Sequence, residues 1–68
     1  MEFKLRSEFI ELDNMLKAFG LVENGAAARQ CIQCGSVKVN AEAETRVRRK
    51  LKAGDVVEFA GKRIDIIG

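Results

Sequence analysis

The stretch GSVKVNA, residues 35–41, is where the sequence changes from a helical to a strand-like period. Val37 and Val39 alternate with Lys38, which is typical of a strand with one buried face. The glycine that opens the stretch suits the left-handed residue that ends a helix, and the Asn40-Ala41 pair predicts a turn. The sequence therefore predicts helix before this point and sheet after it.

Two helices are predicted on the N-terminal side of this stretch. Apolar residues recur at intervals of three and four between Leu12 and Phe19, which indicates a first helix over about those residues. Asn24 is a favourable N-cap for a second helix from about Gly25 to Cys34, which contains three successive alanines. Because few residues separate the two helices, we expect a compact αα-hairpin.

Short strands are predicted around the helices. In residues 42–48 the alternation of side chains indicates a strand with Arg46 and Arg48 on one face. The other predicted strands and turns are Phe3–Arg6 at a sheet edge, Val56–Phe59 and Arg63–Ile67, with turns at 52–55 and 60–61. The predicted fold class is α+β, with the αα-hairpin packed on a small, mostly antiparallel sheet, in one domain over residues 1–68.

The composition argues against an enzyme. The 68 residues include no histidine, tryptophan, tyrosine or proline. Histidine is the commonest general base and a usual zinc ligand, so no catalytic site, metal or other cofactor is expected. The first residues alternate charged and apolar side chains, unlike a signal peptide, and no uncharged run approaches the length of a transmembrane helix. We therefore expect a cytoplasmic, non-catalytic protein that does not contact a membrane.

The CIQCG motif, residues 31–35, has three alternative explanations: structural packing, a metal site shared between two chains, and redox chemistry. Reactive thiols usually lie at a helix N-terminus, where the helix dipole lowers their pKa. Cys31 and Cys34 fall instead in the last turn of the predicted second helix. Cys31 shares an apolar stripe with Ala28 and Ile32, and structural packing is therefore the favoured explanation.

Positive charge is concentrated in the middle of the chain. Residues 29–52 carry seven basic and two acidic side chains, a net charge of +5, in a protein whose net charge is +2. The segments before and after this block carry net charges of −2 and −1. A basic block in a nearly neutral chain is typical of a surface that binds a polyanion, most often a nucleic acid.

The order of these features resembles the αL RNA-binding domain first seen in ribosomal small-subunit protein four, the S-four domain. The resemblance rests on Glu11-Leu12-Asp13-Asn14-Met15-Leu16 with Gly20, on residues 24–28 with Ile32 and Gly35, on Val37, Val39 and Asn40, and on Gly54-Asp55. It covers about residues 10–59, and the chain is most similar to the stand-alone bacterial members, the YbcJ-like group. The resemblance implies RNA as the ligand.

The chain departs from the family pattern at positions where the family has arginine. Glu11 and Gly25 stand at two such positions, and Ala41 replaces the glycine that follows Asn40. We expect the basic residues of segment 46–50 to supply the missing positive charge and to form a continuous basic surface with the rest of the site. The candidate RNA-binding residues are Arg29, Gln33, Lys38, Asn40, Arg46, Arg48, Arg49 and Lys50.

Structured RNA is the expected partner, with ribosomal RNA or tRNA as the leading candidates and the ribosome as a further one. Arginine suits bidentate contact with phosphate. The four phenylalanines are expected to face the core, so no stacking platform for single-stranded bases is predicted. No apolar stripe is left over for self-association, and a monomer is therefore expected.

Two functions of other classes stay open. Sulfur-carrier and ubiquitin-like proteins are also small α+β chains that end in glycine, as this chain does at Gly68, although Ile67 stands where a second glycine would be expected. A protein-binding adaptor is the other alternative. Its binding would be indifferent to RNase and would depend only weakly on salt.

Overall fold

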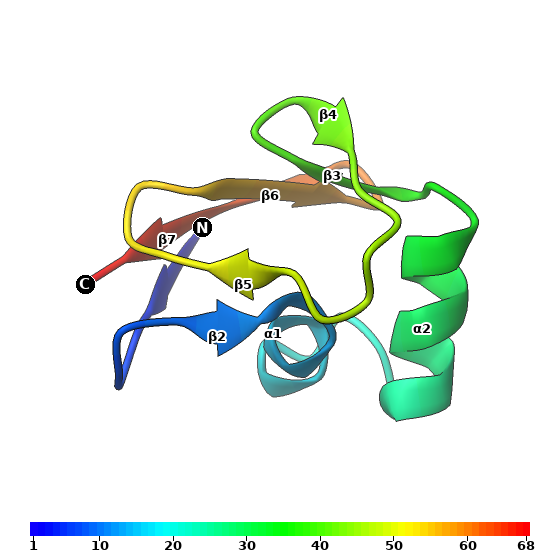
Figure 1. The fold of residues 1–68 in the computed structure, drawn as a ribbon, viewed down its shortest axis with the longest axis horizontal. Coiled ribbons are helices and arrows are strands. Elements are labelled where there is room, and N and C mark those ends of the chain that lie inside the picture. The colour runs from blue at the N-terminus through cyan, green and yellow to red at the C-terminus, as the bar shows by residue number, and fades with distance from the viewer.

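The computed structural model describes all 68 residues, which form two helices and seven short strands (Figure 1). The elements in chain order are β1 Glu2–Lys4, β2 Ile10–Glu11, α1 Leu12–Ala18, α2 Gly25–Gln33, β3 Val37–Val39, β4 Glu42–Ala43, β5 Lys50–Leu51, β6 Val56–Phe59 and β7 Lys62–Ile67. Neither helix is long and apolar enough to cross a membrane.

The main sheet has five strands in the order β1-β7-β6-β3-β4. β1 lies at one edge and pairs in parallel with β7, whereas all other neighbours are antiparallel. Tight turns at residues 40–41 and 60–61 join β3 to β4 and β6 to β7, which requires antiparallel pairing. A second sheet consists of β2 and β5, also antiparallel. The predicted α+β fold with a mostly antiparallel sheet is therefore confirmed.

The core lies between one face of the main sheet and the two helices. Val37 and Val39 of β3, Val57 of β6, and Ile64 and Ile66 of β7 are buried, and within β3 and β7 the buried residues lie two apart, as the two-residue period of a strand requires. The core residues are Val37, Val39, Val57, Ile64 and Ile66 from the sheet, Leu12, Met15, Leu16, Ala28 and Ile32 from the helices, and Leu51 from β5. The helices cover only this face, so the other face of the sheet is free to carry polar side chains.

Both helices begin and end within one residue of the predicted positions. Phe19 is the C-cap of α1 and is followed by Gly20 at a φ of 77°. Asn24 caps α2, because its Oδ1 accepts a hydrogen bond from the Ala27 N–H at 2.8 Å. The helices pack together, but Figure 1 shows α1 along its axis and α2 from the side, so their axes cross steeply. The antiparallel arrangement of an αα-hairpin is thus not confirmed.

The strand predicted over residues 42–48 is wrong beyond Ala43. β4 ends there, and residues 44–49 form a loop that leads into β5 (Figure 1). Arg46 and Arg48 therefore lie in a loop and not on one face of a strand. The alternation in this segment resembled that of a strand, but only two of its residues pair with β3.

The loop leaves the sheet because its carbonyl groups bond to the start of α1. The N–H groups of Leu12 and Asp13 donate to the carbonyls of Arg49 at 2.8 Å and of Val47 at 3.1 Å. The first N–H groups of a helix have no partner within the helix, and the side chain of Glu11, the N-cap residue, makes no capping bond. The loop carbonyls supply the acceptors that a capping side chain would otherwise provide.

The turn between β3 and β4 keeps the backbone of an Asn-Gly hairpin although alanine replaces the glycine. Asn40 and Ala41 both have positive φ angles, 53° and 70°, as a type I′ turn requires. The Asn40 Oδ1 accepts from the Val56 N–H at 2.9 Å, and its Nδ2 donates to Asp55 Oδ1 at 3.1 Å. The Asn40 side chain therefore fixes the turn against the start of β6, and Ala41 adopts a conformation that glycine adopts at lower cost.

Candidate nucleic-acid interface

A hollow in the surface is lined entirely by basic side chains from the segment between β4 and β6. These side chains are Arg46, Arg48, Arg49, Lys50 and Lys52. We call residues 44–52 the basic loop. Four of the five were predicted as candidates, whereas Lys52 belonged to the basic block of the sequence but was not chosen. So many cations around one hollow raise the local concentration of a polyanion.

Glu44, at the start of the basic loop, is the only buried charged residue of the protein. Its Oε2 accepts hydrogen bonds from the backbone N–H and from Nε of Arg46, both at 3.0 Å. Its Oε1 accepts from Nη2 of Arg46 at 3.1 Å and from Nη1 of Arg49 at 2.7 Å. The Glu44 N–H donates to the carbonyl of Val37 at 2.9 Å, which ties the loop to β3. One carboxylate thus holds two guanidinium groups.

These hydrogen bonds keep Glu44 ionised. Donation by Arg46, and secondly by Arg49, lowers the pKa of the Glu44 carboxyl from 4.5 to about 2. The same carboxylate raises the pKa of the Arg46 guanidinium, firstly because it accepts hydrogen bonds from the charged form and secondly because a neighbouring anion favours that form. The sequence indicated the two arginines but not the acid between them. The only available signal was the Glu44-x-Arg46 spacing, which a strand would also have produced.

The far end of the basic loop is held by a strand pair and a turn. β5 pairs with β2, so that Lys50 lies opposite Glu11. The Lys52 N–H donates a hydrogen bond to Asp55 Oδ2 at 2.8 Å, and the Asp55 N–H donates one to the Lys52 carbonyl at 3.0 Å. Gly54 completes this turn at a φ of 99°. The basic side chains are therefore carried on a main chain that is bonded at both ends.

Phe9 corrects the expectation that all four phenylalanines face the core. The other three pack against the core, but Phe9 is 38% exposed. The Nζ of Lys50 lies over its ring, 4.8 Å from the centroid. Phe9 directly precedes β2, and the pairing of β2 with β5, which the sequence did not predict, brings the ring beside the basic loop. A partly exposed aromatic ring therefore borders the hollow.

Two candidates on α2 lie apart from the hollow. Arg29 and Gln33 are exposed on that helix, as predicted, but neither lines the hollow of the basic loop. No hydrogen bond or ion pair joins either side chain to the loop. Their membership of a continuous basic surface stays a prediction.

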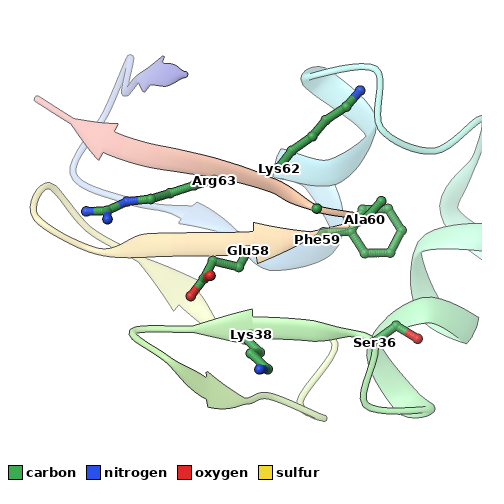
Figure 2. Close-up of a pocket in the computed structure, with 8 residues that line it drawn as sticks. Ser36, Lys38, Glu58, Phe59, Ala60, Lys62 and Arg63 are labelled. Atoms are coloured by element: carbon green, nitrogen blue, oxygen red, sulfur yellow. The ribbon is translucent and has the colours of Figure 1, made fainter.

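Lys38 lines a second hollow, on the exposed face of the main sheet (Figure 2). It lies directly opposite Glu58 of β6, and Glu58 lies opposite Arg63 of β7. Figure 2 shows the Glu58 carboxylate between the two basic side chains. An acid in register between two bases offsets their charge, so this surface differs from the basic loop. Asn40, the remaining candidate, uses both ends of its side-chain amide for bonds within the protein.

The sequence matches the model of the S4 domain family over residues 3–67, which is nearly the whole chain. The chain belongs to the S4 domain family. The resemblance that the sequence motifs indicated is confirmed, and the matched region extends beyond residues 10–59 toward both ends.

Relatives of this S4 domain have been named from two bacteria. The chain is 43% identical over 58 residues to "Putative RNA-binding protein YbcJ" of Escherichia coli (strain K12), covering 85% of this chain and 83% of that protein. It is 38% identical over 55 residues to "Probable ribosome maturation protein RlbA" of Bacillus subtilis (strain 168), covering 81% and 78%. The solution structure of Escherichia coli YbcJ, described as containing an αL motif involved in RNA-binding, superposes with a TM-score of 0.74 at 40% identity, covering 98% of this chain and 86% of that one.

The cysteines of this S4 domain have different surroundings. Cys31 is half-buried and packs against the core, as predicted. Cys34 is exposed; its Sγ donates to the Cys31 carbonyl at 3.4 Å and lies 3.0 Å from the Ser36 Oγ. Hydrogen bonding with Ser36 lowers the pKa of the Cys34 thiol. No group of three or more cysteine, aspartate, glutamate or histidine side chains is placed to hold a metal ion.

Proposed function

We propose that this S4 domain binds structured RNA, with the basic loop as its main contact surface. The observation that carries the proposal is the convergence of five basic side chains on one hollow. Family membership and the RNA-binding description of YbcJ support the same ligand class. Arginine and lysine neutralise phosphates and release counterions, so such a hollow favours the backbone of a nucleic acid over its bases.

Recognition proceeds by shape and phosphate contact. The hollow contains no aromatic side chain, and the ring of Phe9 at its border is covered by Lys50. Single-stranded RNA is usually recognised by bases stacked on open aromatic rings, whereas folded RNA presents arrays of phosphates at fixed spacing. Basic residues on a main chain that is bonded at both ends suit the second kind of target.

Ribosomal RNA or tRNA is the proposed target, with ribosome assembly as the proposed process and the ribosome as partner. The name of the Bacillus subtilis relative, which mentions ribosome maturation, supports this choice. We propose that the protein acts in the cytoplasm as a monomer and without catalysis. Arg29, Gln33, Lys38 and Asn40 remain candidate contacts at the edge of this surface. The family does not favour the sulfur-carrier alternative at Gly68.

The test is a salt series with fluorescently labelled ribosomal RNA fragments and bulk tRNA. If about five phosphates are neutralised, a fourfold rise in salt should weaken binding by roughly two to three orders of magnitude. An Arg48→Ala/Lys52→Ala variant removes two exposed cations of the hollow and leaves the partners of Glu44 in place. It should bind roughly ten- to thirtyfold more weakly, with a salt slope lower by about two.

The matched control is Lys4→Ala/Lys17→Ala, which removes the same charge from exposed positions on β1 and α1. This control should change the affinity by less than about threefold, because screening weakens distant charges. Equal losses in the two variants would show that net charge, and not the basic loop, determines binding. Absence of binding at low salt would overturn the proposed function, and binding that survives RNase treatment would favour a protein-binding adaptor.

A further inference from the structure

Glu44 occupies an unexpected place for an acid in a surface that binds a polyanion. It lies among the basic residues of the loop, yet it is the protein's only buried charged residue, and its side chain is 9% exposed. A carboxylate near a phosphate site lowers the local positive potential. If Glu44 favours RNA binding, it must have another effect that outweighs its repulsion of the phosphates.

The geometry at Arg46 identifies that contribution. Nε and Nη2 of Arg46 both donate to Glu44, so one edge of the planar guanidinium is fully occupied. A guanidinium has five N–H donors. The two on Nη1 and the second on Nη2 have no partner in the protein, and one N–H of Nη1 together with the second N–H of Nη2 forms the neighbouring edge of the plane. Because the Arg46 side chain is 74% exposed, this free edge is available to solvent.

Arg49 bonds to the same carboxylate, and its side chain is less exposed than that of Arg46. Its Nη1 donates to Glu44 Oε1 at 2.7 Å, and its side chain is 27% exposed. Both arginines are therefore bonded to one carboxylate before any ligand arrives. A free arginine side chain must give up rotamer freedom on binding, whereas a side chain that is already held gives up little.

We propose that Glu44 is a positioning residue for RNA binding, which holds Arg46 and Arg49 so that their remaining N–H groups receive phosphate oxygens of the RNA backbone. This role rests on the proposed function. It adds an acidic residue to a set of RNA-binding residues that otherwise carry positive charge. Bidentate contact between the free edge of a guanidinium and a phosphate is the geometry that arginine favours.

A positioning role for Glu44 and simple electrostatics predict opposite changes in RNA affinity for Glu44→Gln. This change removes a negative charge, so electrostatics alone predicts tighter RNA binding. The neutral amide keeps one acceptor oxygen but replaces the other with a donor, so it holds Arg46 and Arg49 less firmly than the carboxylate does. A positioning role for Glu44 therefore predicts weaker binding, by about tenfold. The matched control is Glu42→Gln on β4, because Glu42 is exposed and makes no side-chain hydrogen bond or ion pair. This control should leave the affinity unchanged or raise it by up to about threefold.

A second pair of variants keeps the charge constant. Arg46→Lys preserves one positive charge, but an ammonium group cannot bond Glu44 along one planar edge and a phosphate along another. It should weaken binding by about fivefold and lower the salt slope. Arg48→Lys is the matched control, because Arg48 lines the same hollow without touching Glu44, and it should change the affinity by less than about twofold.

The same labelled ribosomal RNA fragments serve as the probe, and circular dichroism at the assay temperature verifies that each variant is folded. If Glu44→Gln is unfolded, the two arginine-to-lysine variants decide the question. In a double-mutant cycle, Glu44→Gln should have a smaller effect in the Arg46→Lys background than in the wild type.

The measurements distinguish failure of the proposed function from failure of the positioning role of Glu44. A wild-type protein that does not bind RNA overturns the proposed function itself. A wild type that binds, together with a folded Glu44→Gln variant that binds as tightly as Glu42→Gln or more tightly, overturns the positioning role alone. Equal effects of Arg46→Lys and Arg48→Lys would overturn it as well.

Discussion

The basic loop and the exposed face of the main sheet contain similar charged residues but arrange them differently. On the sheet, Glu58 lies in register between Lys38 and Arg63, and acid and base alternate across the strands. In the loop, the acid is Glu44, which is buried beneath two arginines, so that mainly cations face the solvent. The depth of one carboxylate therefore decides whether a cluster of bases presents a positive surface.

Charge reversal in each region should have the largest effect. Arg48→Glu/Lys52→Glu in the loop should weaken RNA binding at least about a thousandfold, because two phosphate contacts become repulsions. Lys38→Glu/Arg63→Glu makes the same change in net charge on the sheet and should weaken binding less than about tenfold. Filter binding at moderate salt measures both. Equal losses would mean that RNA spans both surfaces and would restore Lys38 as a main contact.

Acid titration should reveal how much the ionised Glu44 carboxylate contributes to stability. The Glu44 pKa of about 2 lies below its ordinary value of 4.5, so the ionised form stabilises the folded state above pH about 4.5. That stability is lost as the pH falls from about 4.5 to about 2, and we expect the loss to be on the order of 1–2 kcal/mol.

Urea denaturation between pH 7 and pH 2 measures this loss. Glu44→Gln should reduce the acid-dependent part of the unfolding free energy relative to the wild type. Parallel curves for wild type and Glu44→Gln would contradict the role assigned to the buried carboxylate.

In the turn between β3 and β4, a substitution should raise the stability of the protein by a smaller amount. Ala41 has a φ of 70°, a region that costs an L-residue about 1 kcal/mol, so Ala41→Gly should stabilise the fold by about 0.5–1 kcal/mol. Ala60→Gly tests the corresponding turn between β6 and β7, where φ is 54°. Thermal denaturation reports both. Ala43→Gly in β4 is the control and should destabilise the protein by about 0.5–1 kcal/mol. A destabilised Ala41→Gly variant would show that the turn tolerates alanine without strain.

The smallest expected effect separates two lysines within the loop. Lys50 lies over the ring of Phe9, so Lys50→Gln should lower the unfolding free energy by about 0.5 kcal/mol through the lost cation–π contact. Lys52→Gln has no such ring beneath it and should have a smaller effect. Urea denaturation of the Phe9→Leu/Lys50→Gln double variant tests the coupling. Additive effects would show that the two side chains do not interact.

Most of the fold could be predicted from hydrophobic periodicity and from the residues that begin and end the helices. The stripe in α1, the Asn24 cap and the alternation of Val37 and Val39 in β3 are local patterns, and the structure contains each of them where the sequence placed it. Residues 44–49 could not be predicted in the same way. Their alternation is compatible with a strand, and the interaction that bends them away joins residues more than thirty positions apart along the chain.

The candidate site was predictable to the extent that its residues are neighbours in sequence. Arg46, Arg48, Arg49 and Lys50 lie together because they are almost consecutive. Glu44 was missed because nothing in its sequence surroundings distinguishes a buried acid from an exposed one. Phe9 was missed because its exposure depends on the pairing of β2 with β5, two strands of two residues each that show no periodicity.

The hydrogen bonds from Leu12 and Asp13 to the loop have a consequence for how this surface can change. Their acceptors are carbonyl groups, which every amino acid possesses, so these two bonds do not depend on which side chain stands at the exposed position 48. Mutations there can alter ligand preference while the framework persists. The loop is therefore a suitable place for a combinatorial library, in which the exposed residues 45 and 48 are randomised and selected against different RNAs. Such a library should return many folded members with distinct targets.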